Sequence, residues 1–168
     1  GGGKSAYSIY RKGASSPFVT FSGRVRGGKL EVSLPDDSKF ACFTVLPDTP
    51  KSDGTLTSLS FPAVKLESSE LGDALAMRTM GTGGLQSVLP GRVDGSVMYM
   101  AVARPRTRKG VVKGWLTAFK ANGTISSRVS EGSLFLYPKL DYGCCEVKAG
   151  AAIVPEKFVI GCFDDCRI

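Results

Sequence analysis

Residues 111–129 read VVKGWLTAFKANGTISSRV and determine the expected fold class more than any other stretch. Asn122-Gly123 separates two segments that are rich in β-branched and aromatic residues. Both turn residues tolerate positive φ, which a two-residue hairpin connection requires. The sequence therefore predicts a β-hairpin with strands over residues 111–121 and 124–129.

Short β segments continue on both sides of this predicted hairpin. Residues 29–34 alternate between polar and apolar side chains, which is the period of a half-buried strand. Residues 40–46 form an unbroken apolar run closed by Pro47, which is typical of a strand buried on both faces. Further strands are predicted over residues 18–25, 96–103, 133–137 and 157–163.

One helix is expected over residues 69–80. Ser68 or Ser69 can cap its N-terminus, because a serine hydroxyl accepts a hydrogen bond from a free backbone N–H. Glu70 and Asp73 place negative charge at the positive end of the helix dipole. The helix would form an insertion between strands.

The number and length of these elements predict the fold class. Eight or nine short strands with one inserted helix favour a mainly β fold, an antiparallel β-sandwich or a jelly roll, over parallel βαβ units. No internal repeat or linker divides the chain, so we expect a single β-rich domain over residues 1–168. Residues 1–16 are expected to form a flexible basic arm.

Composition narrows the chemistry that this chain can perform. The 168 residues include no histidine, which excludes Ser-His-Asp and Cys-His nucleophiles and histidine-ligated zinc or haem. Carboxylate pairs and a Ser-Lys dyad remain open to the chain, but no spacing selects either of them. We therefore expect a non-enzymatic protein, with no catalytic residue and no cofactor. No run of 18 apolar residues is present, so no membrane-spanning helix is expected.

Charge is segregated along the chain. The net charge of +7 combines about +6 over residues 1–30, −5 over residues 31–75 and +7 over residues 91–128. Such basic segments are typical of a phosphate-binding surface, because guanidinium groups match phosphate oxygens and binding releases counterions. The alternative is a solvated surface, or one that faces the acidic segment of another copy. The candidate nucleic-acid-binding residues are Arg11, Lys12, Arg24, Arg26, Arg104, Arg106, Arg108, Lys109 and Lys113.

The five cysteines favour reduced thiols over a disulfide framework, because their number is odd. This indicates a reducing compartment. No metal is expected, since the spacing of the four C-terminal cysteines does not match a known zinc knuckle. The candidates for a metal site, if one exists, are Cys144, Cys145, Cys162 and Cys166. The N-terminal Gly1-Gly2-Gly3 suits either cleavage from a polyprotein or a cloning scar.

Three features together resemble the coat proteins of small icosahedral RNA viruses. These are the short strands with one inserted helix, an N-terminal arm rich in Gly, Ser, Lys and Arg, and the segment 154–165, VPEKFVIGCFDD. That segment is similar to the last strand of a jelly roll. The resemblance implies an eight-stranded jelly roll that self-assembles and packages RNA, located in the virion or the host cytoplasm. The arm is shorter and less basic here than in many such proteins.

The leading hypothesis is therefore a structural, capsid-type domain that forms homo-oligomers through complementary charged faces, with a basic surface able to contact RNA. The alternative is a non-enzymatic nucleic-acid-binding module. A histidine-free enzyme that uses carboxylates or a Ser-Lys dyad is the second alternative.

Overall fold

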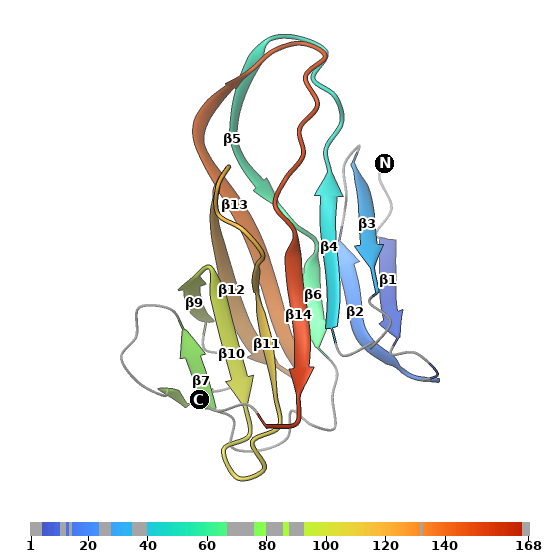
Figure 1. Ribbon diagram of the computed structural model, residues 1–168, viewed down its shortest axis with the longest axis vertical. Helices are drawn as coiled ribbons and strands as arrows, with labels where there is room; N and C mark the ends of the chain where they lie inside the picture. The colour runs from blue at the N-terminus through green and yellow to red at the C-terminus, as the bar shows by residue number, and fades with distance from the viewer. Residues whose placement is uncertain are drawn as a thin grey trace.

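The structure, a computed structural model, describes residues 5–10, 13, 15–23, 28–34, 40–66, 76–79, 86–87, 93–131 and 133–165. Within these ranges the chain forms two antiparallel sheets and no helix (Figure 1). The expectation of a mainly β, antiparallel fold is confirmed. Across the same ranges, no helix is long and apolar enough to cross a membrane.

The first sheet, sheet A, contains seven strands in the order β1-β2-β6-β13-β12-β9, with β5 also paired to β13. Its longest strand, β13, pairs with β12 along one edge and with β5 and β6 along the other. The strands are β1 (Ser5–Tyr10), β2 (Pro17–Gly23), β5 (Gly54–Ser60), β6 (Ala63–Leu66), β9 (Val93–Val97), β12 (Asn122–Ser130) and β13 (Ser133–Val147).

The second sheet, sheet B, also contains seven strands, in the order β3-β4-β14-β11-β10-β7-β8. Strands β14 and β11 lie at its centre and pair over six residues. The strands are β3 (Lys29–Ser33), β4 (Phe40–Leu46), β7 (Ala76–Thr79), β8 (Gln86–Ser87), β10 (Tyr99–Ala103), β11 (Gly110–Trp115) and β14 (Phe158–Phe163).

Two long antiparallel ribbons connect the sheets. In the first ribbon, β4 pairs with β14 in sheet B, and then β5 and β6 pair with β13 in sheet A. Its two crossing connections meet at the narrow upper end in Figure 1, where the N–H of Gly150 donates to the carbonyl of Pro50 at 2.8 Å. There the Asp53 carboxylate accepts the N–H of Ala149 and contacts Lys148, and these two bonds lower the pKa of Asp53. In the second ribbon, β9 pairs with β12 in sheet A and β10 pairs with β11 in sheet B.

The predicted strand over residues 96–103 is divided between the sheets at Met98. Met98 has a φ of 66° and lies between β9 and β10. Its N–H donates to the carbonyl of Gly123, and its carbonyl accepts the N–H of Trp115. A single residue in the left-handed region therefore carries the chain from sheet A to sheet B.

The hairpin predicted around Asn122-Gly123 is wrong. The two segments do form strands, β11 and β12, but these lie in different sheets, and Asn122 and Gly123 are the first residues of β12. The hairpin of this ribbon turns instead at Arg104–Lys109, between β10 and β11. Asn122 and Gly123 are residues that favour a tight turn, but both pair with β13 here, Gly123 opposite Leu140, so they continue the strand instead.

The predicted helix over residues 69–80 is also wrong where the structure describes it. Residues 76–79 form β7, which pairs with β10 from Met100 to Ala103. Pairing with an adjacent strand satisfies the backbone groups that a helix would have satisfied locally. Residues 69–75 and 80 lie outside the described ranges.

The flexible arm expected over residues 1–16 is not what the structure shows for residues 5–10. These residues form β1, which pairs with β2 from Ser5↔Gly23 to Ile9↔Val19. Ile9 is buried in the core, which explains why this segment is held against the sheet. Residues 1–4, 11, 12 and 14 lie outside the described ranges.

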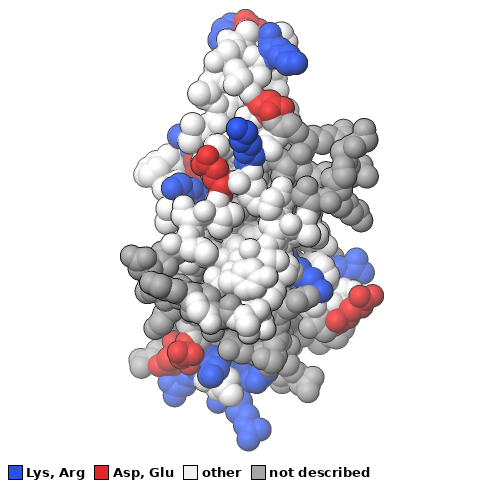
Figure 2. Space-filling model, turned by 90° about the vertical axis from the view of Figure 1, so that its right-hand side faces the viewer, with Lys and Arg blue, Asp and Glu red and all other residues white. Residues whose placement is uncertain are grey.

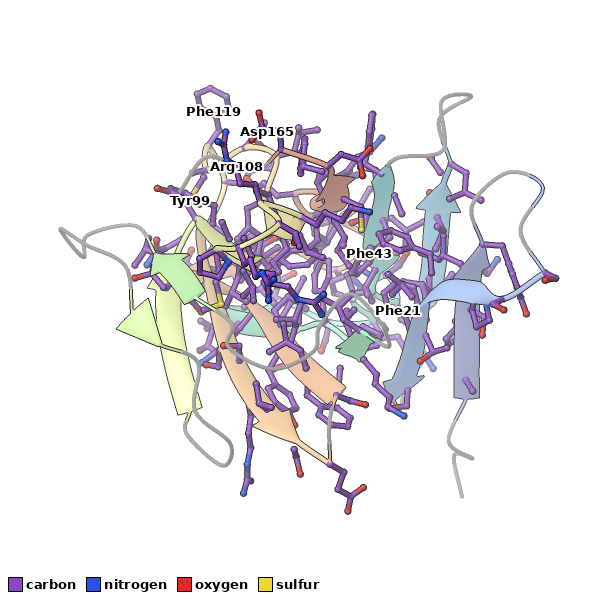
Figure 3. All side chains as sticks on the ribbon, turned by 90° about the horizontal axis from the view of Figure 1, so that it is seen from below. Phe21, Phe43, Tyr99, Arg108, Phe119 and Asp165 are labelled. Carbon is purple, nitrogen blue, oxygen red and sulfur yellow. The ribbon has the colours of Figure 1, made fainter. Side chains whose placement is uncertain are left out.

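The core lies between the two sheets and contains a connected series of aromatic rings. Phe21 of sheet A contacts Phe43 of sheet B with ring centroids 4.8 Å apart (Figure 3). Phe43 contacts Phe158 at 5.3 Å, and Phe158 contacts Trp115 at 5.1 Å. Edge-to-face pairs of this kind add about 0.5–1.5 kcal/mol each to the effect of burial. The Phe21–Phe43 pair therefore joins the two sheets, while the other two pairs lie within sheet B.

Candidate functional site

The basic cluster predicted from the sequence forms a compact turn between β10 and β11. The N–H of Arg104 donates to the carbonyl of Lys109, and the N–H groups of Thr107 and Arg108 donate to the carbonyl of Arg104. Arg108 has a φ of 58° and contacts Asp165 at 3.3 Å, with both side chains more than half exposed (Figure 3). The backbone of the turn is thus fixed by its own hydrogen bonds, so the Cα positions of its basic residues are set before any ligand binds.

Three of the predicted basic residues are exposed on this turn, namely Arg106, Arg108 and Lys109, while Arg104 is half-buried at its base. The face shown in Figure 2 carries most of its charged side chains toward its upper and lower ends, with a stretch of uncharged described residues between them. Four further candidates, Arg11, Lys12, Arg24 and Arg26, lie outside the described ranges.

The structure corrects the prediction for Lys113. Its side chain is fully buried on β11, between Met100 of β10 and Ile160 of β14. Its Nζ has no hydrogen-bond partner among the described residues, and burial lowers the pKa of the amine to about 7. Lys113 follows the inward alternation of Val111 and Trp115, so it cannot reach a phosphate from this position.

The candidate cysteines do not come together. Cys144 and Cys145 are exposed where the pairing of β13 with β5 shifts register, and Cys144 has a φ of 65°. Cys162 lies on β14 opposite Val111, in the other sheet, and Cys166 is outside the described ranges. No group of three or more His, Cys, Asp or Glu side chains able to hold a metal occurs in the described part of the chain.

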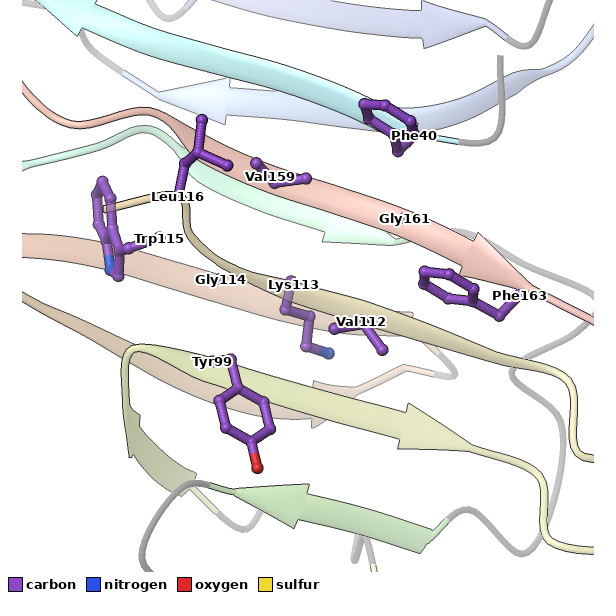
Figure 4. A pocket seen from close by; sticks show the side chains of 10 residues that line it. All are labelled: Phe40, Tyr99, Val112, Lys113, Gly114, Trp115, Leu116, Val159, Gly161 and Phe163. Carbon is purple, nitrogen blue, oxygen red and sulfur yellow. The ribbon is translucent and has the colours of Figure 1, made fainter. Parts of the chain in front are cut away.

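An apolar hollow of about 370 Å³ lies on the outer face of sheet B (Figure 4). Gly114 and Gly161 lie on its floor, and the absence of their side chains leaves space between the strands. Exposed apolar residues surround this floor, and Leu116 is 61% exposed. The residues that border the hollow with outward side chains are Phe40, Tyr99, Val112, Leu116, Val159 and Phe163.

The apolar loop, residues 116–121, connects β11 to β12 and projects from the same side of the protein. Phe119 is 94% exposed, and its ring points away from the body of the protein in Figure 3. The sequence prediction missed this loop because it treated residues 111–121 as one strand. Strict alternation from Trp115 would have placed Phe119 on the inward side.

The apolar loop is nevertheless anchored on both sides of Phe119. The N–H of Leu116 donates to the carbonyl of Lys157 at 2.8 Å, and the N–H of Lys120 donates to the carboxylate of Glu156 at 2.6 Å. The Lys120 ammonium also donates to the carbonyl of Val154 at 3.0 Å. Glu156 is itself buried, so the anchor is part of the folded structure.

Tyr142 lies close to this anchor. Burial raises the pKa of its phenol to about 12, with further contributions from the charges of Glu156 and Cys145. The phenol therefore stays protonated over the physiological range, and this group supplies no base.

The described surface thus offers two candidate sites of different chemistry, the basic turn and the apolar face of sheet B. Comparison of the sequence with models of known protein families finds no match, and no curated protein is significantly similar to it.

Proposed function

We propose that this chain is a structural, self-assembling β-domain of the kind found in the coats of small icosahedral RNA viruses. The observation that carries the proposal is the apolar outer face of sheet B, where an exposed phenylalanine lies beside an apolar hollow. Exposed apolar patches rimmed by polar residues mark interaction surfaces, because water contact with them costs free energy that association recovers.

The strand pairing supports a fold of the jelly-roll type as part of this proposal. A jelly roll consists of two antiparallel sheets whose strands pair across a rolled ribbon. The nested pairs β4–β14, β6–β13, β9–β12 and β10–β11 follow such a ribbon. The chain departs from simple alternation between sheets, because the consecutive pairs β6–β13 and β9–β12 share sheet A.

RNA is the proposed second partner, contacted through the basic turn. Arg106, Arg108 and Lys109 project from a loop whose backbone is already fixed, so the backbone loses little conformational entropy when these side chains meet phosphates. A location in the virion or in the host cytoplasm belongs to this proposal. No catalytic residue is assigned.

The test is the size of the protein in solution, measured by light scattering after size-exclusion chromatography. We expect oligomers at micromolar concentration at both low and high salt, because apolar contacts do not weaken when charges are screened. Added RNA should increase the particle mass at low salt. A monomer under every condition up to high concentration would contradict the proposal.

The second candidate, a nucleic-acid-binding module that does not assemble, is favoured by the preformed basic turn itself. It predicts that replacing Arg106, Arg108 and Lys109 with Gln reduces the steepness of the fall of log K with log salt, changing the negative slope by about 2 toward zero for single-stranded RNA. The control replaces three exposed lysines elsewhere, Lys51, Lys139 and Lys148, with Gln and should change the slope less. Equal slopes for the basic-turn variant and the unchanged protein would contradict this candidate.

A further inference from the structure

We infer that Phe119 of one copy seats in the apolar hollow of a second copy, so that two chains pair through the outer faces of their B sheets. The inference rests on the proposed self-assembly and names the surface that performs it. It joins two features that the fold places side by side, the projecting ring and the hollow.

The backbone on either side of the projecting ring is held in a fixed position. Hydrogen bonds hold the apolar loop on either side of Phe119, through Leu116 and through Lys120. A side chain whose backbone is already ordered loses less conformational entropy on binding. Phe119 therefore has the properties of an interface anchor, being aromatic, exposed and held in place.

The hollow has the size and chemistry to receive an aromatic ring. An apolar cavity of about 150 Å³ is enough to bind benzene, and the hollow measures about 370 Å³. The two glycines on its floor leave little room for a side chain of their own. A side chain at Gly114 would meet the carbonyl of Met98 at 2.7 Å, and one at Gly161 would meet the Phe163 ring at 3.1 Å.

A second copy of this chain is the occupant that fits this arrangement. A two-fold interface brings the same surface of both partners together, so each projection must face the partner's hollow. Here both features belong to one face of sheet B, and a two-fold axis that lies in the interface plane, midway between ring and hollow, brings each ring opposite the other copy's hollow. Each ring then enters the other copy's hollow at the same time.

The charges at the two ends of the hollow are mixed. Lys120 and Lys157 lie beyond Leu116, whose N–H bonds to Lys157, while Asp164 and Asp165 follow Phe163 at the other end, next to the basic turn. The rotation places the two lysines of one copy toward two aspartates and the exposed cations Arg106, Arg108 and Lys109 of the other. Charge therefore does not select this pairing, which rests on the apolar contacts.

The apolar area is also close to what a stable pair requires. At about 200 Å² for a whole large apolar side chain, the exposed fractions of the large apolar residues on this face supply about 550 Å² per copy. A standard interface buries about 800 Å² per partner, and the polar rim supplies the remainder. The residues counted are Phe40, Tyr99, Leu116, Phe119 and Phe163.

The closing experiment combines a substitution with a crosslink in the full chain. Phe119→Ser should raise the dissociation constant of the pair at least about thirtyfold, as expected for a central aromatic anchor. Tyr137→Ser is the matched control, because Tyr137 is an exposed aromatic residue on sheet A, and it should leave the constant within about threefold. An equal effect of both substitutions overturns the inference.

p-Azidophenylalanine at position 119 then identifies the contact. Crosslinks to Val112, Val159 or Phe163 of a second copy support the inference. Crosslinks elsewhere on a second copy overturn it but leave self-assembly standing. Crosslinks only to RNA or to another protein also overturn it. A monomer without crosslinks contradicts both the inference and the proposed function.

Discussion

The two ends of β11 carry connections that are equally exposed but chemically opposite. At one end, the basic turn holds out Arg106, Arg108 and Lys109, and at the other, the apolar loop holds out Phe119. Hydrogen bonds fix both connections. The difference shows how one strand can present an ionic site and a hydrophobic site at a fixed separation.

The two connections differ in what holds them. The basic turn bonds mainly to itself, from Arg104 to Lys109, so it depends little on the rest of the protein. The apolar loop depends on Glu156 and Lys157, which come from a segment more than 30 residues away. We therefore expect substitutions in the core and at the anchor to affect the apolar loop more than the basic turn.

The largest effect is expected at Lys113, between the two ends. In the folded state the buried amine has a pKa of about 7, whereas an ordinary lysine has a pKa of 10.5. Between these values only the unfolded state binds the proton, so stability rises with pH from 7 to 10.5 and is lowest below 7. Lys113→Met should raise the free energy of unfolding by about 5 kcal/mol below pH 7, with a gain that declines toward pH 10.5.

Urea unfolding of both proteins at pH 6, 8 and 10 measures this dependence. If the extra unfolding free energy of Lys113→Met is the same at all three pH values, the amine is not held in a desolvated site. The RNA affinity proposed for the basic turn should not change in Lys113→Met, since Lys113 does not reach the surface.

The second effect tests the packing at the apolar end. A Cβ at Gly123 would overlap the indole ring of Trp115, whose Nε1 donates to the carbonyl of Thr124 at 3.2 Å. Gly123→Ala should cost about 3 kcal/mol of stability, because the ring must leave its aromatic neighbours. Gly95→Ala on the adjacent strand is the control, since its nearest neighbour would be 4.0 Å away. Equal unfolding midpoints for the two variants would contradict the packing role of Gly123.

The third effect tests whether Glu156 anchors the apolar loop. Glu156→Leu removes the acceptor of the Lys120 N–H and should cost about 1 kcal/mol, whereas Glu156→Gln keeps an oxygen in place. Hydrogen exchange at the Lys120 amide should accelerate about tenfold in Glu156→Leu only. Unchanged protection in that variant would show that Glu156 does not anchor the apolar loop.

The smallest effect is expected at the basic end. Asp165→Asn removes the contact with Arg108, whose side chain is 61% exposed. The substitution should lower the free energy of unfolding by less than about 0.5 kcal/mol, because exposed ion pairs contribute little. Thermal unfolding at low salt and at 1 M salt measures the difference, which should vanish at 1 M salt because of screening. A cost above 1 kcal/mol would show that the turn depends on this ion pair.

The hairpin error illustrates what local sequence can and cannot predict. Asn122-Gly123 has the residues of a tight turn, yet Gly123 is needed because the Trp115 ring lies against it. Period and composition correctly predicted that β11 and β12 are strands. Their assignment to different sheets depends on β13, which is distant in sequence and provides the pairing partner for β12.

The basic turn was predictable and the apolar face was not. Arg104 to Lys109 is a run of adjacent charges between two β segments, so sequence alone places it in an exposed loop. The hollow assembles residues from β4, β10, β11 and β14, which only the pairing order of sheet B brings together. Lys113 is a different case, since its burial follows from local alternation with Val111 and Trp115, a pattern that the prediction set aside in favour of its charge.

Local patterns predict the mainly β character, the positions of most strands and the basic turn, because period-2 patterning and charge clustering act over a few residues. Contacts between distant segments set which sheet each strand joins, where the ribbon turns and which side chains are buried. Residues 76–79, expected at the end of a helix, form β7 instead. Phe119 is exposed, on the same side of the protein as a hollow that has Gly114 and Gly161 on its floor. These outcomes depend on long-range pairing, whose free energy outweighs the local preference of any single segment.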